Sequence, residues 1–220
     1  MDMLSFTEEN HLKAIFHLSI DEEIGVSTNA IAQNINTKAP SVTDMLKKLC
    51  DKGLVTYKKY QGAALTELGR KTALNIIRKH RLWEVFLVEK LNFNWSEVHE
   101  VAEQLEHIKS KKLTNELDKF LGYPTKDPHG DPIPNTTRFI KYTKKLLLSD
   151  LQIGDKGTFV GVKDSSSAFL KYLDKRKIAL GSIIEILHIE DFDDSLHIGM
   201  AEINLTISMK SANNIYLTKI

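Results

Sequence analysis

The chain has 220 residues, of which 42% are hydrophobic and 27% are charged, and its formal net charge is only +1. This composition is typical of globular proteins with two or three domains, and no stretch approaches the roughly eighteen apolar residues of a transmembrane helix. Because the first residues do not resemble a signal peptide, we expect a cytoplasmic protein with no membrane partner, in which the lone Cys50 is a buried, reduced thiol.

Residues 1–65 have the pattern of a winged helix-turn-helix domain. Ser5 and Glu8 have the spacing of a capping box, so a first helix is expected to begin there. A second short helix is expected near residue 28, and a third begins near Pro40 and ends near Gly53. Two alternating stretches then predict the strands of a β-hairpin, residues 54–57 and 63–66. Helix, turn, helix and hairpin in this order are typical of a DNA-binding domain.

Positive charge gathers on the predicted third helix and hairpin. Between Lys38 and Lys71 there are eight lysines and arginines against three aspartates and glutamates, although the whole chain is nearly neutral. This is the electrostatic pattern of phosphate contact, and the start of such a helix also reaches base edges. The partner is therefore expected to be double-stranded DNA. The predicted DNA-binding residues are Lys38, Pro40, Ser41, Thr43, Lys47, Lys48, Lys58 and Lys59.

Residues 66–137 are expected to form a helical domain. Three helices are predicted: one over about 66–91, one from Ser96 that carries residues 99–107, and one over about 114–121. The long helix contains Trp83 and Phe86, and its apolar surface is expected to pair two copies of the chain. The segment 123–134 contains four of the five prolines and predicts an ordered turn or the start of a linker.

Metal-capable side chains are concentrated in the first two of these helices. His80 and Glu84 face the same way on the first, and a larger group lies within about 100° of one face of the second: His99, Glu103, Glu106 and His107. Two such faces turned toward each other would gather imidazole and carboxylate groups around one or two cations. Nitrogen and oxygen donors without thiolate suit Mn(II), Fe(II), Co(II), Ni(II) or Zn(II), and disfavour an iron–sulfur or structural zinc site. The alternative is two ordinary charged helix faces.

The chain changes character after a basic connector, residues 138–150, which is expected to be a linker with helical content. Three stretches then alternate in steps of two, and a short helix over about 168–175 interrupts them: 157–162, 182–187 and 202–207. This pattern predicts a small SH3-like β-barrel over residues 151–220. The predicted fold class is mainly α: a winged helix-turn-helix domain, a helical domain and a C-terminal barrel.

With these parts in this order, the sequence resembles the diphtheria toxin repressor and manganese transport regulator family of metal-dependent transcriptional repressors. The family's segments stand here at 7–16, 39–43, 78–82, 99–107 and 128–134. The resemblance is close over 7–134 and rests on architecture over 151–220, where it implies an FeoA-like domain. It implies that Glu103, Glu106 and His107 form a regulatory metal site, and that His80, Glu84 and His99 form a neighbouring one. In manganese-type members the residue matching His80 joins a two-metal cluster instead.

The chain departs from the family pattern at three positions. Glu103 stands where iron-type repressors have cysteine, and a carboxylate there favours Mn(II), with Fe(II) second. Zn(II), Co(II) or Ni(II) are expected to bind in vitro. Asn10 stands where the family supplies methionine or aspartate, and its amide oxygen is the expected ligand from the first helix. Lys13 stands where the manganese-type cluster has a carboxylate, so the same two-metal geometry is not assumed.

The predicted function is a metal-activated repressor that binds operator DNA as a homodimer and controls metal-ion homeostasis. Two alternatives belong to other classes. His99 and Glu100 begin a pattern seen in zinc proteases, but the second histidine of that motif is absent, which disfavours a metallohydrolase. The other alternative is a winged-helix regulator that senses an organic ligand. Only the first function predicts a DNA complex that a chelator abolishes.

Overall fold

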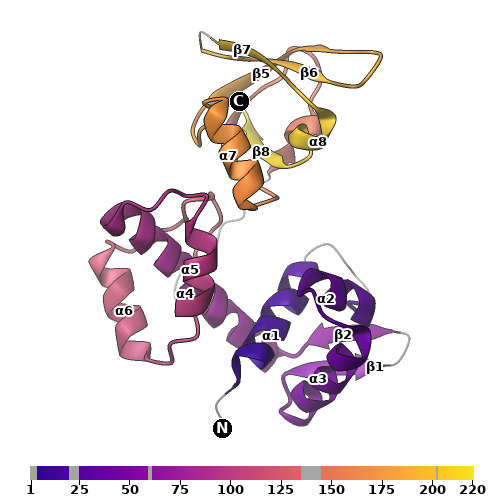
Figure 1. Cartoon of the computed structure of the whole chain (residues 1–220), viewed down its shortest axis with the longest axis vertical. Helices are drawn as coiled ribbons and strands as arrows, with labels where there is room; N and C mark the ends of the chain where they lie inside the picture. Colours follow the sequence, from indigo (N-terminus) through magenta and orange to yellow (C-terminus); the bar gives the residue numbers. More distant parts are fainter. Residues whose placement is uncertain (1–3, 20–24, 59–60, 135–144, 202) are drawn as a thin grey trace. The chain divides into compact units, whose positions relative to one another are not determined.

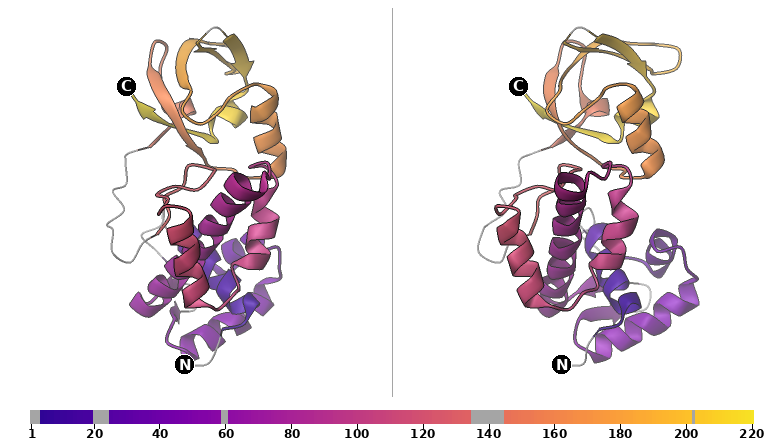
Figure 2. Two further views of the ribbon diagram at one scale, coloured as in Figure 1. Left: turned by 90° about the vertical axis from the view of Figure 1, so that its left-hand side faces the viewer. Right: turned by 60° about the vertical axis from the view of Figure 1, so that its left-hand side comes forward.

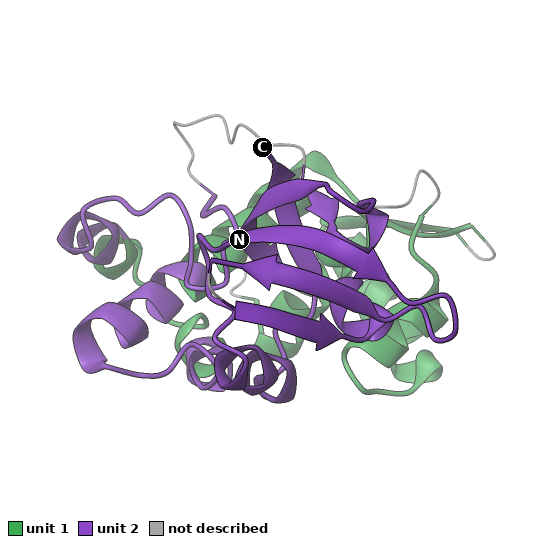
Figure 3. Ribbon diagram, turned by 90° about the horizontal axis from the view of Figure 1, so that it is seen from above, with its two compact units in different colours: residues 1–80, 103–114 green, residues 81–102, 115–220 purple. Residues whose placement is uncertain are grey.

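The computed structural model describes residues 4–19, 25–58, 61–134, 145–201 and 203–220. The chain forms two compact units, Met1–His80 with Glu103–Thr114, and Arg81–Ala102 with Asn115–Ile220 (Figure 3). Across the described ranges, no helix combines the length and the apolar character needed to cross a membrane.

Three helices and a hairpin in the first unit form the predicted winged helix-turn-helix (Figure 1). The elements are α1 (Phe6–Leu18), α2 (Thr28–Asn34), α3 (Ala39–Asp51), β1 (Val55–Lys58) and β2 (Gly62–Leu65). The capping box is confirmed, because the Ser5 hydroxyl accepts a bond from the Glu8 backbone N–H and the Glu8 carboxylate accepts one from the Ser5 backbone N–H. Pro40 lies in the first turn of α3 as predicted, and β1 pairs antiparallel with β2.

The core of this domain comes from the apolar stripes of its helices. Val42, Leu46 and Leu49 of α3 are fully buried, and they belong to one cluster with Leu12 and Ile15 of α1. Burial of each such side chain contributes about 1.5–3 kcal/mol, so this stripe fixes which face of α3 is left exposed. Cys50 was expected to be buried, but the structure shows that it is only half-buried, next to Leu49 on α3.

The helical segments that follow are α4 (Glu67–Leu91), α5 (Val98–Leu105) and α6 (Lys111–Phe120). The prediction that one helix carries residues 99–107 is wrong at its end, because Glu106 and His107 lie in a turn after α5. Their contacts with α1, described below, outweigh the helix propensity of this segment. In the second unit, Leu82 and Val85 of α4 pack with Leu117 of α6.

The C-terminal part of the second unit is an antiparallel six-stranded sheet in the order β3-β8-β4-β5-β6-β7 (Figure 2). The strands are β3 (Leu146–Leu147), β4 (Lys156–Val162), β5 (Ile183–Ile189), β6 (Leu196–Met200), β7 (Ile203–Ile207) and β8 (Ile215–Lys219). Leu170 and Leu173 of α7 (Ser167–Lys175) pack into its core with Phe159. A short 3-10 helix (Leu148–Asp150) and α8 (Met209–Ala212) complete this part.

Two sequence expectations for this region need correction. The sheet begins at Leu146, inside the segment 138–150 assigned to a linker, and residues 138–144 of that segment lie outside the described ones. Strands β6 and β8 were not predicted. Among the described strands no pairing joins the edges β3 and β7, so the structure shows a sheet domain and not a closed barrel.

Candidate metal centre

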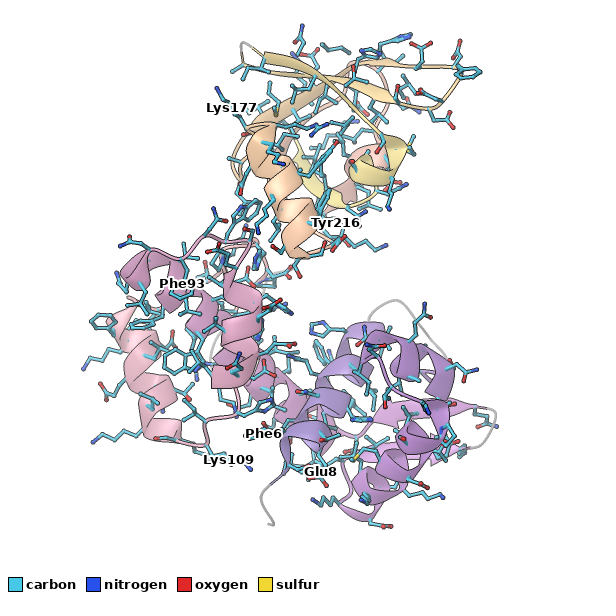
Figure 4. All side chains as sticks on the ribbon, viewed as in Figure 1. Phe6, Glu8, Phe93, Lys109, Lys177 and Tyr216 are labelled. Atoms are coloured by element: carbon cyan, nitrogen blue, oxygen red, sulfur yellow. The ribbon has the colours of Figure 1, made fainter. Side chains whose placement is uncertain are left out.

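The centre begins with one face of α1. Phe6, Asn10 and Lys13 are spaced by four and three residues and so share a helical face, with Glu9 beside them. The opposite face is buried in the winged-helix core through Leu12 and its neighbours. The apolar stripe of α1 therefore turns these polar side chains away from the core. Figure 4 labels Phe6 and Glu8 on the N-terminal part of this helix.

His107 contacts this face of α1 through both its edge and its ring plane. Its Nδ1 lies 2.6 Å from Oε2 of Glu9, and both side chains are buried. The ring of Phe6 stacks on the imidazole with centroids 4.3 Å apart. A proton on Nδ1 that is donated to Glu9 leaves the lone pair on Nε2, which is the arrangement that metal-binding histidines require. Nε2 lies 3.9 Å from Oε1 of Glu106, so both atoms border the same space.

Glu106 is a fully buried carboxylate with cationic and imidazole partners. Nδ1 of His80 lies 2.6 Å from Oε2, and Nζ of Lys13 lies 2.8 and 3.0 Å from the two carboxylate oxygens. Burial acts to raise the pKa of Glu106, but the hydrogen bond with His80 and the charge of Lys13 outweigh it and hold the pKa below its ordinary value. Glu106 is therefore ionised at neutral pH. His80 thus lies against Glu106.

Asn10 offers a further oxygen on the same face of α1. Its Oδ1 is buried and has no hydrogen-bond partner among the described residues. An unpaired buried carbonyl oxygen costs about 1–3 kcal/mol, so its presence needs an explanation such as a bound ion. With the carboxylates of Glu103 and Glu106 and the imidazole of His107, it offers the kinds of donor atom that suit a divalent cation such as Mn(II), Fe(II) or Zn(II).

Glu103 and Lys79 complete the charges of this group. Glu103 is 47% exposed and its Oε1 lies 3.2 Å from Nζ of Lys13. Lys79 is buried, and burial lowers its pKa although the carboxylates of Glu9 and Glu106 oppose that effect. Three carboxylates thus lie with Lys13 and Lys79, and the charge of Lys109 also acts on Lys79.

The second unit holds the other predicted metal residues. Nδ1 of His99 lies 3.4 Å from Oε1 of Glu84, and Nδ1 of His129 lies 3.5 Å from Oε2 of the same carboxylate. Glu84, Asp127 and His129 are all buried and each offers a ligand atom within 4.8 Å of the others. This second group shares Glu84 with the predicted set of His80, Glu84 and His99, and it adds two residues that were not predicted as ligands, Asp127 and His129.

Asp127 also organises the proline-rich turn. Its Oδ1 accepts the backbone N–H groups of His129 and Asp131 at 2.8 and 2.9 Å, and Nε of Arg81 lies 3.3 Å from Oδ2. Burial, with the nearby carboxylate of Glu84, raises the pKa of Asp127 to about 6. His129 donates from Nε2 to the carbonyl oxygen of Trp95 at 2.8 Å, which leaves Nδ1 facing Glu84. Of the two alternatives for 123–134, an ordered turn or the start of a linker, the structure shows the ordered turn.

The predicted DNA-binding residues lie on the exposed side of the first unit. On α3, Pro40, Ser41, Lys47 and Lys48 are exposed, opposite the buried stripe. The exposed set also includes Lys38 before α3 and Lys58 at the end of β1. Thr43 is half-buried and its hydroxyl donates to the carbonyl oxygen of Ala39 at 3.1 Å, while Lys47 forms an exposed ion pair with Asp44. Lys59 lies outside the described residues.

Sequence reasoning missed several residues of the metal centre. Glu9 and Phe6 were not selected, although their spacing to Asn10 and Lys13 places them on or beside the same helical face. Lys13 was noted only as a departure from a pattern, and its ion pairs join residues 90 or more positions apart in the chain. Nothing local in the sequence predicts that contact.

Comparison with known proteins covers nearly the whole chain. The family model "Iron dependent repressor, N-terminal DNA binding domain" matches residues 3–63. The model "Iron dependent repressor, metal binding and dimerisation domain" matches residues 66–135, and the model "FeoA domain" matches residues 146–219.

Curated relatives match only part of their own length. The iron-dependent repressor IdeR of Mycobacterium tuberculosis is 36% identical over 136 residues, which are 61% of this chain and 58% of that protein. A probable metal transport system membrane protein of Chlamydia trachomatis is 44% identical over 90 residues, which are 41% of this chain and 20% of that protein. The chain therefore spans less than two thirds of these relatives.

Solved structures match over full length. A manganese-dependent transcriptional repressor in complex with manganese has a TM-score of 0.89 and 31% identity, with 97% of this chain and 100% of that chain covered. The manganese regulator SloR has a TM-score of 0.78 and 34% identity, with 97% and 98% covered. The identity, coverage and shared domain order show that the chain belongs to the diphtheria toxin repressor and manganese transport regulator family of metal-dependent transcriptional repressors.

Proposed function

We propose that the protein is a metal-activated transcriptional repressor that binds operator DNA and controls metal-ion homeostasis, with Mn(II) favoured over Fe(II). The observation that carries the proposal is the contact between α1 of the winged-helix domain and the candidate ligands. Phe6 and Glu9 contact His107, and Lys13 contacts Glu106, within one compact unit. Because α1 and α3 share a core, a change at these ligands acts directly on the helix that presents Ser41 and Lys47.

The residues that would hold the cation are Asn10, Glu103, Glu106 and His107. A bound divalent cation would supply the positive charge that balances their carboxylates. Glu9 keeps the proton of His107 on Nδ1, which leaves Nε2 as the donor atom. His80 holds the carboxylate of Glu106 in place through its Nδ1. A second site at Glu84, His99 and the newly found His129 is proposed in the other unit.

The metal preference rests on donor chemistry. Glu103 brings a hard carboxylate and Asn10 a neutral amide oxygen, and oxygen donors of this kind suit Mn(II) and then Fe(II). Similar structures include manganese-dependent repressors and a form of ScaR with bound Zn²⁺, whereas the relative IdeR is an iron-dependent repressor. These relatives support a divalent transition metal, and the carboxylate at position 103 supports the manganese choice.

The partners are operator DNA and a second copy of the chain. We propose a DNA-binding domain over 1–65, a dimerisation domain over 66–137 and an FeoA-like sheet domain that begins at Leu146. Phe120 is 64% exposed and its ring lies 6.3 Å from that of the half-buried Phe86, so α4 and α6 present apolar surface suited to pairing. A dimer places two α3 helices about one DNA turn apart, near 34 Å, or multiples of it. The compartment of such a repressor is the cytoplasm.

The proposal is tested by anaerobic DNA retardation on operator DNA selected from a random pool, with Mn(II), Fe(II), Zn(II) or a chelator. We expect a complex that forms with Mn(II) and disappears with chelator. Asn10→Leu should leave the fold intact and abolish the response to metal, while Asn115→Leu, the same change at an exposed site of α6, should retain it. A complex that is indifferent to chelator would favour a regulator of another ligand class. The metallohydrolase alternative gains no support, because the matched family models are those of repressors.

A further inference from the structure

The ammonium group of Lys13 lies among the oxygens that the metal site would use. Nζ is 2.8 and 3.0 Å from the two oxygens of Glu106 and 3.2 Å from Oε1 of Glu103. The Lys13 side chain is only 13% exposed and that of Glu106 is fully buried, so these are short contacts with little screening by water. Lys13 therefore bridges the two carboxylates as a cation would.

The side chain at position 13 changes the charge around any bound ion. Glu9, Glu103 and Glu106 bring three negative charges, and Lys13, Lys79 and Lys109, whose charge acts on Lys79, bring three positive ones. One divalent ion then leaves an excess of two positive charges, and two would leave an excess of four. With a carboxylate at position 13 the group would instead be two charges short, and two divalent ions would leave the same excess of two. The side chain at position 13 thus sets how many ions the group can hold.

Each carboxylate oxygen has two lone pairs, so the ammonium does not exhaust the donor capacity of Glu103 and Glu106. Oε1 of Glu106, which contacts Lys13, also lies 3.9 Å from Nε2 of His107, so this oxygen and the imidazole border the same space. The buried Oδ1 of Asn10, on the same face of α1 as Lys13, supplies a further donor. Donor atoms for one ion thus remain, while the ammonium group occupies the space between Glu103 and Glu106.

We propose that Lys13 is a resident cation that takes the place of a second metal ion, so that this centre binds a single divalent ion per chain. This inference rests on the metal site of the proposed function. It also gives Lys13 a role without metal: its ion pairs tie α1 to the segment 103–106 and keep two clustered carboxylates from repelling each other. The same charge repels an incoming cation and weakens its binding.

The test counts Mn(II) ions on the full-length protein by equilibrium dialysis and by electron paramagnetic resonance, which detects spin coupling between neighbouring Mn(II) ions. Wild type should show no coupled pair, and Lys13→Glu should bind one more ion per chain and show the coupled signal. Lys111→Glu makes the same charge change at an exposed position at the start of α6 and should leave the count unchanged. A coupled pair in wild type, or an unchanged count in folded Lys13→Glu, would overturn the inference.

A second variant keeps the inference testable if Lys13→Glu does not fold. Lys13→Leu removes the charge without adding a donor atom, so the ion count should stay at the wild-type value and Mn(II) should bind at least about tenfold more tightly. Equal or weaker binding in Lys13→Leu would also refute the resident-cation role. Glu106→Gln separates this result from the proposed function: if wild type and Glu106→Gln bind Mn(II) alike, the metal site itself is wrong.

Discussion

Replacing Glu9 tests whether His107 is a metal ligand oriented by its neighbour. Glu9→Gln keeps the size of the side chain but removes the negative charge that faces Nδ1 of His107 at 2.6 Å. An amide presents either its oxygen or its NH₂ group to the ring, so the Nδ1–H tautomer is no longer enforced. Where the NH₂ group faces Nδ1, the proton moves to Nε2 and blocks the donor atom.

The expected loss of Mn(II) affinity follows from what a carboxylate contributes when it orients a ligating histidine. Loss of a carboxylate that orients a ligating histidine costs about 10- to 100-fold in metal affinity, which is about 1.4–2.7 kcal/mol. Both side chains are buried, so solvent does not replace the lost hydrogen bond and the upper half of this range is expected. The assay is anaerobic calorimetric titration with Mn(II).

Glu8 provides a matched control on the same helix. Glu8 and Glu9 are both 6% exposed, but the Glu8 carboxylate accepts bonds from Nζ of Lys52 at 2.6 Å and from the Ser5 backbone at 2.8 Å. Glu8→Gln should therefore lower the free energy of unfolding and leave the Mn(II) affinity unchanged. If Glu9→Gln bound Mn(II) as tightly as wild type, or if both variants lost affinity equally, the assignment of His107 and its orienting partner would be refuted.

Three further predictions concern other parts of the chain. Lys47→Ala and Lys58→Ala should weaken binding to all DNA sequences and each reduce the log–log salt slope by roughly 1; a wild-type slope would show that they do not contact phosphates. Glu103→Cys should shift relative affinity from Mn(II) toward Fe(II), Ni(II) or Zn(II) in competition calorimetry, because thiolate is the softer donor; unchanged ratios would remove Glu103 from the ligand set. Burial raises the pKa of Asp127 to about 6, so this carboxyl group holds a proton more tightly in the folded protein than in the unfolded chain. The stabilisation that this proton gives is complete below about pH 4 and is lost as the pH rises through about 6. The Asp127→Asn side chain cannot ionise, so the free energy of unfolding of this variant in urea, relative to that of wild type, should rise by up to ~3 kcal/mol between pH 4 and pH 7. A difference between the two proteins that does not change with pH would contradict the raised pKa.

Local signals predicted most of the first unit. The capping box at Ser5 and the stripe of Val42, Leu46 and Leu49 both follow from spacing alone, and both appear in the structure. Gly53 ends α3 with a φ of 67°, a conformation that glycine adopts without strain. These features depend on residues within one or two helical turns, which is why the sequence reveals them.

Long-range contacts account for what the sequence did not reveal. The helix was expected to reach His107, but Glu9 and Phe6 hold that residue in a turn after Leu105. Strand β6 contains Gly199 and a short alternating pattern, and only its pairing with β5 and β7 identifies it as a strand. Candidate ligands were found by residue type, whereas the partners that orient and balance them depend on which faces the fold brings together.

Reciprocal linkage between metal and DNA tests the central claim most directly. Mn(II) affinity is measured by calorimetry with and without selected operator DNA, and DNA affinity by fluorescence anisotropy with and without Mn(II). If the centre at Glu106 and His107 activates DNA binding, each ligand must tighten the other by the same factor, in the range of about 5- to 150-fold typical of such coupling. Glu106→Gln should reduce both factors to one. Equal Mn(II) affinity of the wild-type protein with and without DNA would contradict the account.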